Sequence, residues 1–180
     1  MSARTEKLFY IDSEFVEEHG EVDLLSFAIV TDDERDRFGS LYFALDDWDD
    51  KDLPPWHVDN VLPYLKNIER IGRESARTRL HNFFRYHTNE FAKKPRVLGY
   101  YSAFDFVAFS SLWGRMIDLP KGVPNYFYDL RTFNALDDHK INLKSFLDKD
   151  AKLHDALADA CGVRDMHRGW KKALRELSPA

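Results

Sequence analysis

Short apolar runs separated by charged turns dominate the first 45 residues of the chain. Three of these runs, over residues 8–11, 24–31 and 40–45, have the length and the apolar content of buried strands. Polar turns connect them, and the first of these turns contains Gly20. Because strands joined by short turns pair antiparallel, the pattern predicts a three-stranded meander with the first strand innermost.

Helical and strand patterns alternate along the rest of the chain. Apolar residues at helical spacing predict a helix over residues 75–91, and a strand follows over 96–101. A helix then starts just before Asp105, a short strand over 126–130 is expected to lie parallel to the first, and the last helix begins near Asp155, with a second helix after Gly162. We therefore expect one domain over residues 1–180 with an α/β fold, in which helices flank a mixed five-stranded sheet of three antiparallel strands and then two parallel ones.

Two acidic residues directly follow the first apolar run. Asp12 and Glu14 are two residues apart, and a strand points such residues to the same face. At about 4 Å, two like charges repel by roughly 4 kcal/mol at an effective dielectric constant near 20, so a core strand needs a compensating proton, base or cation. The pair predicts a divalent metal site, and the alternative is a carboxylate solvated at the strand end.

Three further residues are candidates for the same site. Asp105 lies in the first turn of the helix that follows the fourth strand, and His154 and Asp159 lie near the last helix. On a continuous helix, residues five apart do not share a face, so His154 must precede the helix if both contribute. Asp155 as the N-cap residue would produce that arrangement. Sites in α/β proteins lie at the carboxyl ends of sheet strands, where we expect these residues to converge.

Charge and composition narrow the range of partners. The net charge of −5 argues against binding nucleic acid through an overall positive field, so a polyanion would have to be recruited locally. The other face of the helix over 75–91, extended by the preceding arginine, is basic and could contact backbone phosphates, and a solvated face is the alternative. Its basic residues are Arg73, Arg77, Arg79 and Arg85. The single Cys161 and the lack of a long apolar stretch lead us to expect a cytoplasmic protein that does not bind membranes.

Taken in order, these acidic residues and the histidine resemble the DEDDh family of 3'-to-5' exonucleases, within the RNase H-like superfamily. The matching segments are Tyr-Ile-Asp-Ser-Glu-Phe at 10–15, Tyr-Ser-Ala-Phe-Asp at 101–105 and His-Asp-Ala-Leu-Ala-Asp at 154–159. Within the family the chain looks most like the small mycobacterial-type exoribonucleases, with which it also shares Leu-Trp-Gly at 112–114. One departure is Tyr101, where many relatives have Asn, so the backbone or sugar contacts of that Asn are not expected here.

The resemblance implies two Mg²⁺ or Mn²⁺ ions that clamp the scissile phosphate. By analogy Asp12 bridges both ions, Glu14 and Asp159 complete the ion on the side of the attacking water, and Asp105 holds the other, largely through water. His154 is the implied general base. These five residues are the predicted catalytic residues, and the four acidic ones are the predicted metal ligands.

The same resemblance implies a pocket for one terminal nucleotide. We expect Phe15 to stack on or wedge beside the terminal base, Ser13 and Phe15 backbone groups to meet the free 3' hydroxyl, and Trp113 to form another wall. For Phe15 and Trp113 the alternative is core packing.

The expected function is hydrolysis of single-stranded RNA from its 3' end to nucleoside 5'-monophosphates. A DNA 3'-to-5' exonuclease is the nearest alternative, because nothing in the sequence identifies a contact to the 2' hydroxyl. An inactive nucleic-acid binding module is another. The His154–Asp155 doublet also occurs in HD-type phosphohydrolases, but their all-helical fold does not match the strand-rich first third. Relatives often dimerise, so a homodimer is expected as a further possibility.

Overall fold

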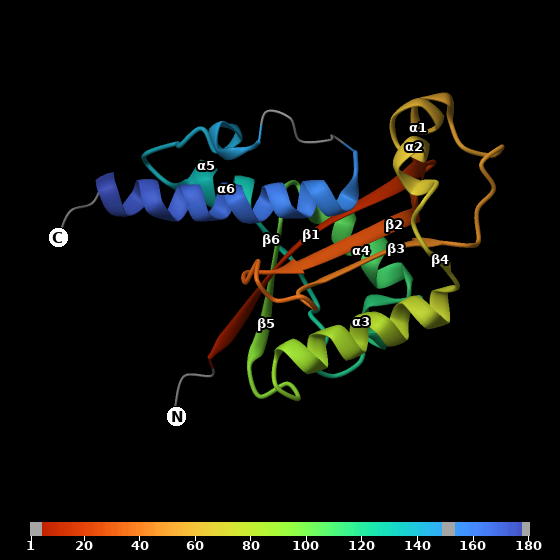
Figure 1. Cartoon of the computed structure of the whole chain (residues 1–180), viewed down its shortest axis with the longest axis horizontal. Helices are drawn as coiled ribbons and strands as arrows, with labels where there is room; N and C mark the ends of the chain where they lie inside the picture. Colours follow the sequence, from red (N-terminus) through yellow and green to blue (C-terminus); the bar gives the residue numbers. More distant parts are fainter. Residues whose placement is uncertain (1–4, 149–153, 178–180) are drawn as a thin grey trace.

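The chain folds as a mixed β-sheet with helices on both faces (Figure 1). This computed structural model describes residues 5–148 and 154–177. The strand order is β4-β3-β2-β1-β5-β6. The strands are β1 (Glu6–Glu18), β2 (Glu21–Thr31), β3 (Ser40–Leu45), β4 (Arg70–Ile71), β5 (Lys94–Gly99) and β6 (Tyr128–Asp129). The helices are α1 (Pro55–Asn60), α2 (Leu62–Leu65), α3 (Arg73–His87), α4 (Ala103–Ser111), α5 (Leu130–Leu136), α6 (Ala156–Leu177) and the short 3-10 helices η1 (Met116–Asp118) and η2 (Leu143–Phe146).

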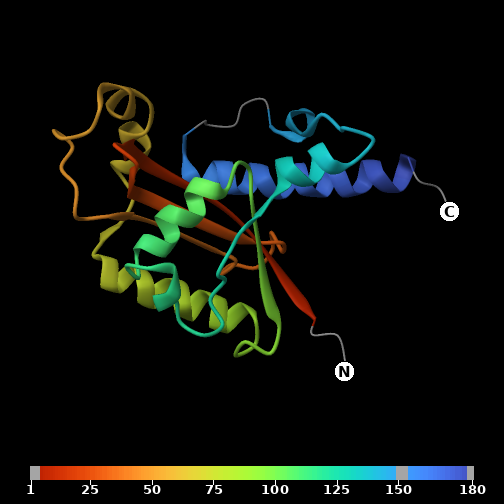
Figure 2. The same ribbon diagram turned by 180° about the vertical axis from the view of Figure 1, so that it is seen from behind.

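The two faces of β1 bury different helices, as the alternation of side chains along a strand requires. Phe9 and Ile11 belong to the core beneath α3 and α4, which includes Leu80 and Phe109. Tyr10 belongs to the opposite core, beneath α6. Figure 2 shows α3 and α4 on one side of the sheet and α6 crossing the other. Residues 12 and 14 of β1 therefore face α6, and residue 13 faces α4.

The strand β1 is longer than the sequence pattern predicted. The expected strand end at Asp12 is wrong, because the antiparallel ladder with β2 continues through the pairs Asp12–Ala28 and Glu14–Ser26 and reaches Glu18. β5, by contrast, pairs with β1 only as far as Tyr10. Asp12 and Glu14 thus lie just past the carboxyl end of the parallel part of the sheet, although they are in the middle of their own strand.

The sheet has six strands rather than the five expected. The additional strand, β4, is only two residues long and pairs parallel with Ala44 and Leu45 of β3. The meander of β1, β2 and β3 is antiparallel and β5 and β6 are parallel to β1, as predicted. Two residues carry too little periodicity to reveal a strand in the sequence.

Two helix boundaries differ from the sequence-based expectation. α3 ends at His87 instead of Phe91, because Asn89, Glu90 and Phe91 all have positive φ and turn the chain away from the helix axis. α6 is one continuous helix through Gly162, so the expected break there is wrong. A Cβ atom at Gly162 would lie 2.9 Å from Leu147 Cδ2, which shows that this glycine serves close packing against the segment that contains η2.

Within the described residues, no helix is long and apolar enough to cross a membrane.

The close approach of α6 to η2 makes a prediction about stability. A Cβ atom at Gly169 of α6 would clash with the base of the Phe146 ring. Overpacking of this kind costs about 1–3 kcal/mol, whereas alanine in place of glycine favours a helix by about 1 kcal/mol. We expect the clash to prevail, so that Gly169→Ala lowers the free energy of unfolding by about 1 kcal/mol in urea denaturation. Lys172→Ala, at an exposed position of the same helix, should change the free energy of unfolding by less than about 0.5 kcal/mol. A Gly169→Ala variant that is more stable than the wild type would contradict the expected clash with Phe146.

Candidate active site

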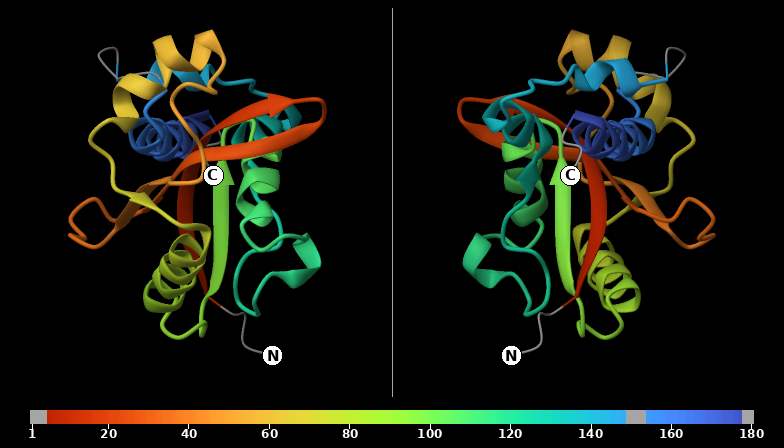
Figure 3. Two further views of the ribbon diagram at one scale, coloured as in Figure 1. Left: turned by 90° about the vertical axis from the view of Figure 1, so that its right-hand side faces the viewer. Right: turned by 90° about the vertical axis from the view of Figure 1, so that its left-hand side faces the viewer.

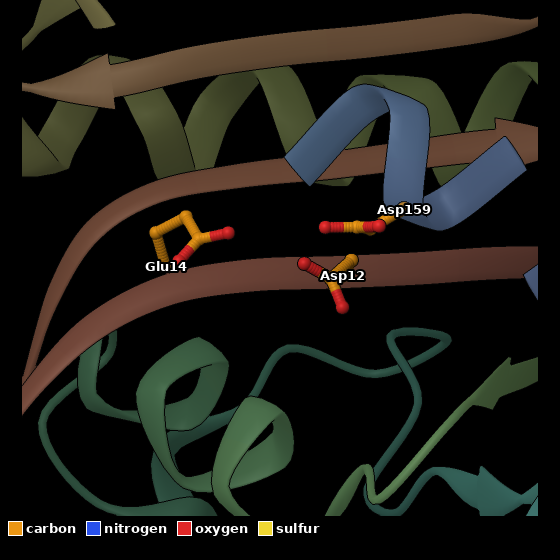
Figure 4. Close-up of side chains that lie close together, drawn as sticks. All are labelled: Asp12, Glu14 and Asp159. Atoms are coloured by element: carbon orange, nitrogen blue, oxygen red, sulfur yellow. The ribbon is translucent and has the colours of Figure 1, made fainter. Parts of the chain in front are cut away.

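Three carboxylates from two distant parts of the chain meet between β1 and α6. Asp12 and Glu14 project from β1 toward the helix, and Asp159 projects from the first turns of α6 toward the strand (Figure 4). One oxygen from each of the three lies within 4.8 Å of the others. Glu14 is buried, and Asp12 and Asp159 are half-buried. The sequence-based expectation that these three residues converge agrees with this geometry.

The carboxylates of this cluster resist ionisation. Burial, together with the charges of Asp105, Glu14 and Asp159, raises the pKa of Asp12 well above its usual range. Burial, followed by the charges of Asp159 and Asp105, raises the pKa of Glu14 to about 8. Burial also raises the pKa of Asp159. With no cation present, the three groups therefore share protons at neutral pH, and a bound cation would favour the fully ionised cluster.

Asp105 lies on the other side of β1. It is in the first turn of α4, is 5 % exposed, and accepts a hydrogen bond of 2.5 Å from the Ser13 hydroxyl. Burial raises the pKa of Asp105 to about 6, although the hydrogen bonds from Ser13 act in the opposite direction. Asp105 is close enough for its charge to raise the pKa of Asp12, but it is not part of the three-carboxylate cluster. The Ser13 side chain thus positions Asp105.

His154 immediately precedes α6, as the spacing of the last motif predicted. The Asp155 carboxylate accepts hydrogen bonds from the backbone N–H groups of Leu157 (3.1 Å) and Ala158 (3.4 Å), which makes Asp155 the N-cap residue. The His154 backbone N–H donates to Asp159 Oδ2 at 2.9 Å, and its φ of 66° turns the chain at this point. The N-cap and this turn place the histidine at the edge of the carboxylate cluster.

Trp56 is a neighbour of the site that the sequence pattern did not reveal. Its ring packs edge-on against the His154 ring, with centroids 4.8 Å apart, and is 50 % exposed. Trp56 is in the short helix α1, which packs beside the start of α6 on the face of the sheet that carries the cluster (Figure 3). The only local sequence signal near Trp56 is Pro54–Pro55, which is typical of the start of a helix. This signal does not indicate that Trp56 contacts His154.

The predicted nucleotide-binding residues have different surroundings. Phe15 is half-buried and stacks on Phe104, which is 45 % exposed, with ring centroids 5.9 Å apart. The Phe15 carbonyl lies 3.0 Å from His57 Nε2 and accepts its hydrogen bond. Trp113 instead packs on Phe109 in the core beneath α4, at 5.0 Å between centroids. Phe15 therefore borders an exposed aromatic surface, whereas the contacts of Trp113 are those of a packing residue.

Comparison with known proteins supports the same class of enzyme. No family model matches the chain. Two proteins named 3'-5' exoribonuclease, from two strains of Mycobacterium tuberculosis, are each 29% identical over 168 residues, which cover 91% of this chain and 90% of the relative. The resemblance to these exonucleases is confirmed.

Solved structures agree on the fold. The nuclease domain of 3'hExo, described as a DEDDh family member bound to rAMP, superposes with a TM-score of 0.66 at 11% identity and covers 96% of this chain and 95% of that domain. A 3'-exonuclease in a study of histone mRNA stem-loop recognition gives a TM-score of 0.64 at 11% identity, covering 96% and 84%. The RNase H-like fold class expected from the sequence is confirmed. The relatives and neighbours together support a 3'-to-5' exonuclease.

The raised pKa values predict how stability depends on pH when metal is removed. Because the folded protein raises the pKa of Glu14 from 4.5 to about 8, stability is greatest where Glu14 is protonated and falls as the pH rises from about 4.5 to 8. Each unit of such a difference corresponds to about 1.4 kcal/mol. We expect urea denaturation in EDTA to show this fall and Glu14→Gln to reduce it. Glu17→Gln, at an exposed position of β1, is the matched control; stability that is constant or rises over this range would show that the cluster is not strained.

Proposed function

We propose that the protein is a metal-dependent 3'-to-5' exoribonuclease that removes nucleoside 5'-monophosphates from the 3' end of single-stranded RNA. The observation that carries the proposal is the cluster of Asp12, Glu14 and Asp159, with His154 tied to Asp159 at its edge. Relatives named 3'-5' exoribonuclease support RNA as the substrate. Two structural neighbours, the 3'hExo domain with rAMP and yeast Pan2 with AAGGA RNA, are described as complexes with RNA components.

The donor set fits Mg²⁺ or Mn²⁺. Both ions prefer oxygen ligands, and the cluster offers three carboxylates within 4.8 Å that resist ionisation unless a cation balances them. Asp12, Glu14 and Asp159 would hold one ion, and Asp12 with Asp105 would hold the second. Two such ions, when bound, supply charge stabilisation at the scissile phosphate and lower the pKa of the attacking water.

The protein's own residues would orient and deprotonate the water. His154 accepts its proton as the general base. The backbone link from His154 to Asp159, the Asp155 N-cap and the Trp56 ring together hold the imidazole beside the carboxylates. Ser13 holds the Asp105 carboxylate in a fixed orientation from the other side of β1. The geometry of the site is therefore set by hydrogen bonds that do not depend on the substrate.

Selection for a chain end would rest on the aromatic surface next to the cluster. The exposed face of the Phe15–Phe104 pair offers a stacking platform for the terminal base, and the backbone of Ser13 and Phe15 would meet the 3' hydroxyl. Trp113 packs on Phe109 of α4, so it would contribute to this surface only through that packing. A single domain over residues 1–180, a cytoplasmic location and a homodimer stay predictions.

The direct test is cleavage of matched RNA and DNA oligonucleotides, labelled at either end, with Mg²⁺ or Mn²⁺ and with EDTA. We expect the 5'-labelled RNA to shorten progressively, the 3'-labelled RNA to release labelled mononucleotide at once, and RNA to react faster than DNA. Asp12→Asn should abolish cleavage together with the thermal stabilisation by Mn²⁺. Faster cleavage of DNA would support a DNA exonuclease instead. RNA binding by the wild type without cleavage in either metal would support the inactive binding module.

A second test separates His154 from the metal ligands. We choose His154→Asn because asparagine tolerates positive φ and keeps the backbone N–H that binds Asp159. Loss of a general base lowers kcat by about 10²–10⁴-fold. Stabilisation by Mn²⁺ should persist in this variant, since the carboxylates are unchanged. Full activity of His154→Asn would remove His154 from the mechanism without touching the metal site.

A further inference from the structure

The basic face expected on α3 is largely neutralised by acidic partners. Arg73 pairs with Asp47, Arg79 pairs with Glu69 at 2.7 Å, and Arg85 pairs with Glu90 at 2.7 Å. These ion pairs join α3 to the loop before α1, to the residue before β4 and to the turn that follows α3. Three of the four arginines on the basic face that the sequence predicted are thus paired, and Arg77 is the fourth.

A different basic surface lies at the start of β5, the end of this strand that is away from the carboxylate cluster. A cavity of about 460 Å³ opens there between the turn after α3 and the segment that leads into β6. We call it the lysine groove, and its principal lining residues are Phe91, Lys93, Lys94, Lys121, Tyr126 and Tyr128. Figure 2 shows these two segments side by side at the start of β5, away from the first turn of α6.

The positive charge of the lysine groove is not neutralised. Lys93, Lys94 and Lys121 are exposed, and none of them forms an ion pair within the described residues. The one acidic residue in the lining, Glu90, is paired with Arg85. In a chain with a net charge of −5, this is a local concentration of free positive charge.

Aromatic rings lie among these lysines. Tyr126 and Tyr128 pack edge-on with centroids 5.0 Å apart, and their hydroxyl groups are 2.8 Å apart. Lys94 Nζ lies 5.9 Å from the centre of the Tyr126 ring, and Arg96 lies over the Tyr128 ring at 5.1 Å. The hydrogen bond with Tyr128 and the charge of Lys94 lower the pKa of Tyr126. Tyr126 is 43 % exposed, so its ring is accessible to a ligand.

The lysine groove is built by close contact between its two segments. Gly122 has a φ of 96°, and a Cβ atom there would lie 2.7 Å from the Phe91 ring. Only glycine satisfies both constraints without displacing the ring. The backbone contact fixes the segment that carries Lys121 and Tyr126 against the turn that carries Lys93.

We propose that the lysine groove binds single-stranded RNA upstream of the 3' end that the carboxylate cluster receives, an inference that rests on the proposed function. Lysines that contact phosphates and rings that stack on bases together are the usual means of binding a single strand without reading its sequence. An acidic peptide would use the lysines but not the rings, so the rings favour RNA.

The separation of the two sites makes the groove a second, independent binding surface. Lys94 of β5 lies opposite Glu6 of β1 in the register of the two parallel strands. Asp12 is six residues further along β1, which is about 20 Å at the usual rise of a strand. A dinucleotide cannot reach both places, whereas a longer RNA can. The groove should therefore favour long substrates over short ones.

The test uses the full chain with Lys93→Gln, Lys94→Gln and Lys121→Gln combined. The matched control combines Lys140→Gln, Lys144→Gln and Lys172→Gln, which are exposed near α5, η2 and α6 and change the net charge equally. With an RNA of about 20 nucleotides, we expect the groove variant to raise KM about tenfold without changing kcat. The ratio of kcat/KM for the long RNA to that for a dinucleotide should fall by the same factor, and the control should leave it unchanged.

Binding in EDTA, where no cleavage is expected, provides a second measurement. Fluorescence anisotropy with the long RNA should show weaker binding by the groove variant and a smaller salt dependence, by about 0.7 in the slope for each phosphate that a lysine no longer neutralises. Tyr126→Leu should weaken binding severalfold, whereas Tyr126→Phe retains the ring and should not.

Three results obtained with the variants would overturn the proposal. They are equal effects of the groove and control variants, an equal reduction of kcat/KM on the dinucleotide and the long RNA, and unchanged RNA binding with weaker binding to an acidic peptide. If the wild type cleaves neither substrate, the proposed function fails and the role of the groove in holding a substrate fails with it. Cleavage of both substrates with no length dependence overturns the groove alone.

Discussion

Repulsion among carboxylates is the constraint on which the site depends. Three acidic side chains whose carboxylate oxygens lie within 4.8 Å of one another oppose folding unless protons or a cation compensate their charges. The fold holds them there through rigid elements: the ladder of β1 with β2 continues on both sides of Asp12 and Glu14, and α6 is packed on the same face of the sheet. The packing of the two cores holds these charges together, and a cation bound among them would relieve the repulsion.

The start of α6 shows how local backbone structure sets the chemistry. Asp155 caps the helix, so Asp159 falls in its first turns facing β1, and the His154 N–H returns to the same Asp159. Asp105 is held independently by Ser13, from the opposite face of the strand. The acidic residues therefore reach Asp12 from both faces of β1, which is possible because β5 ends at the level of Tyr10 and leaves this part of the strand uncovered on that edge.

Features that depend on neighbours in sequence were predictable, and features that depend on distant partners were not. The Asp155 N-cap, the shared face of Asp12 and Glu14 and the antiparallel meander follow from spacing within a few residues, and the structure agrees with each. The extension of β1 to Glu18 depends on β2 as its partner, and the close packing at Gly162 of α6 depends on Leu147. Trp56 beside His154 and the lysine groove join segments far apart in the chain, and no local pattern marks such pairs.

The charge of the molecule is segregated rather than uniform. Three carboxylates gather at the middle of β1, and free lysines gather about 20 Å away at its start. The arginines of α3, which the sequence presents as a basic face, mainly join elements to one another. Net charge alone therefore says little about whether a protein of this kind binds a polyanion.

Whether the carboxylate cluster, together with Asp105, binds a pair of divalent cations decides the proposed chemistry. Calorimetric titration of the metal-free protein with Mn²⁺, at a pH near the raised pKa of about 8 for Glu14, measures this binding without a substrate. We predict saturable binding of two ions per chain, accompanied by release of protons from the cluster. Absence of saturable Mn²⁺ binding by the folded wild-type protein would contradict the metal-dependent mechanism.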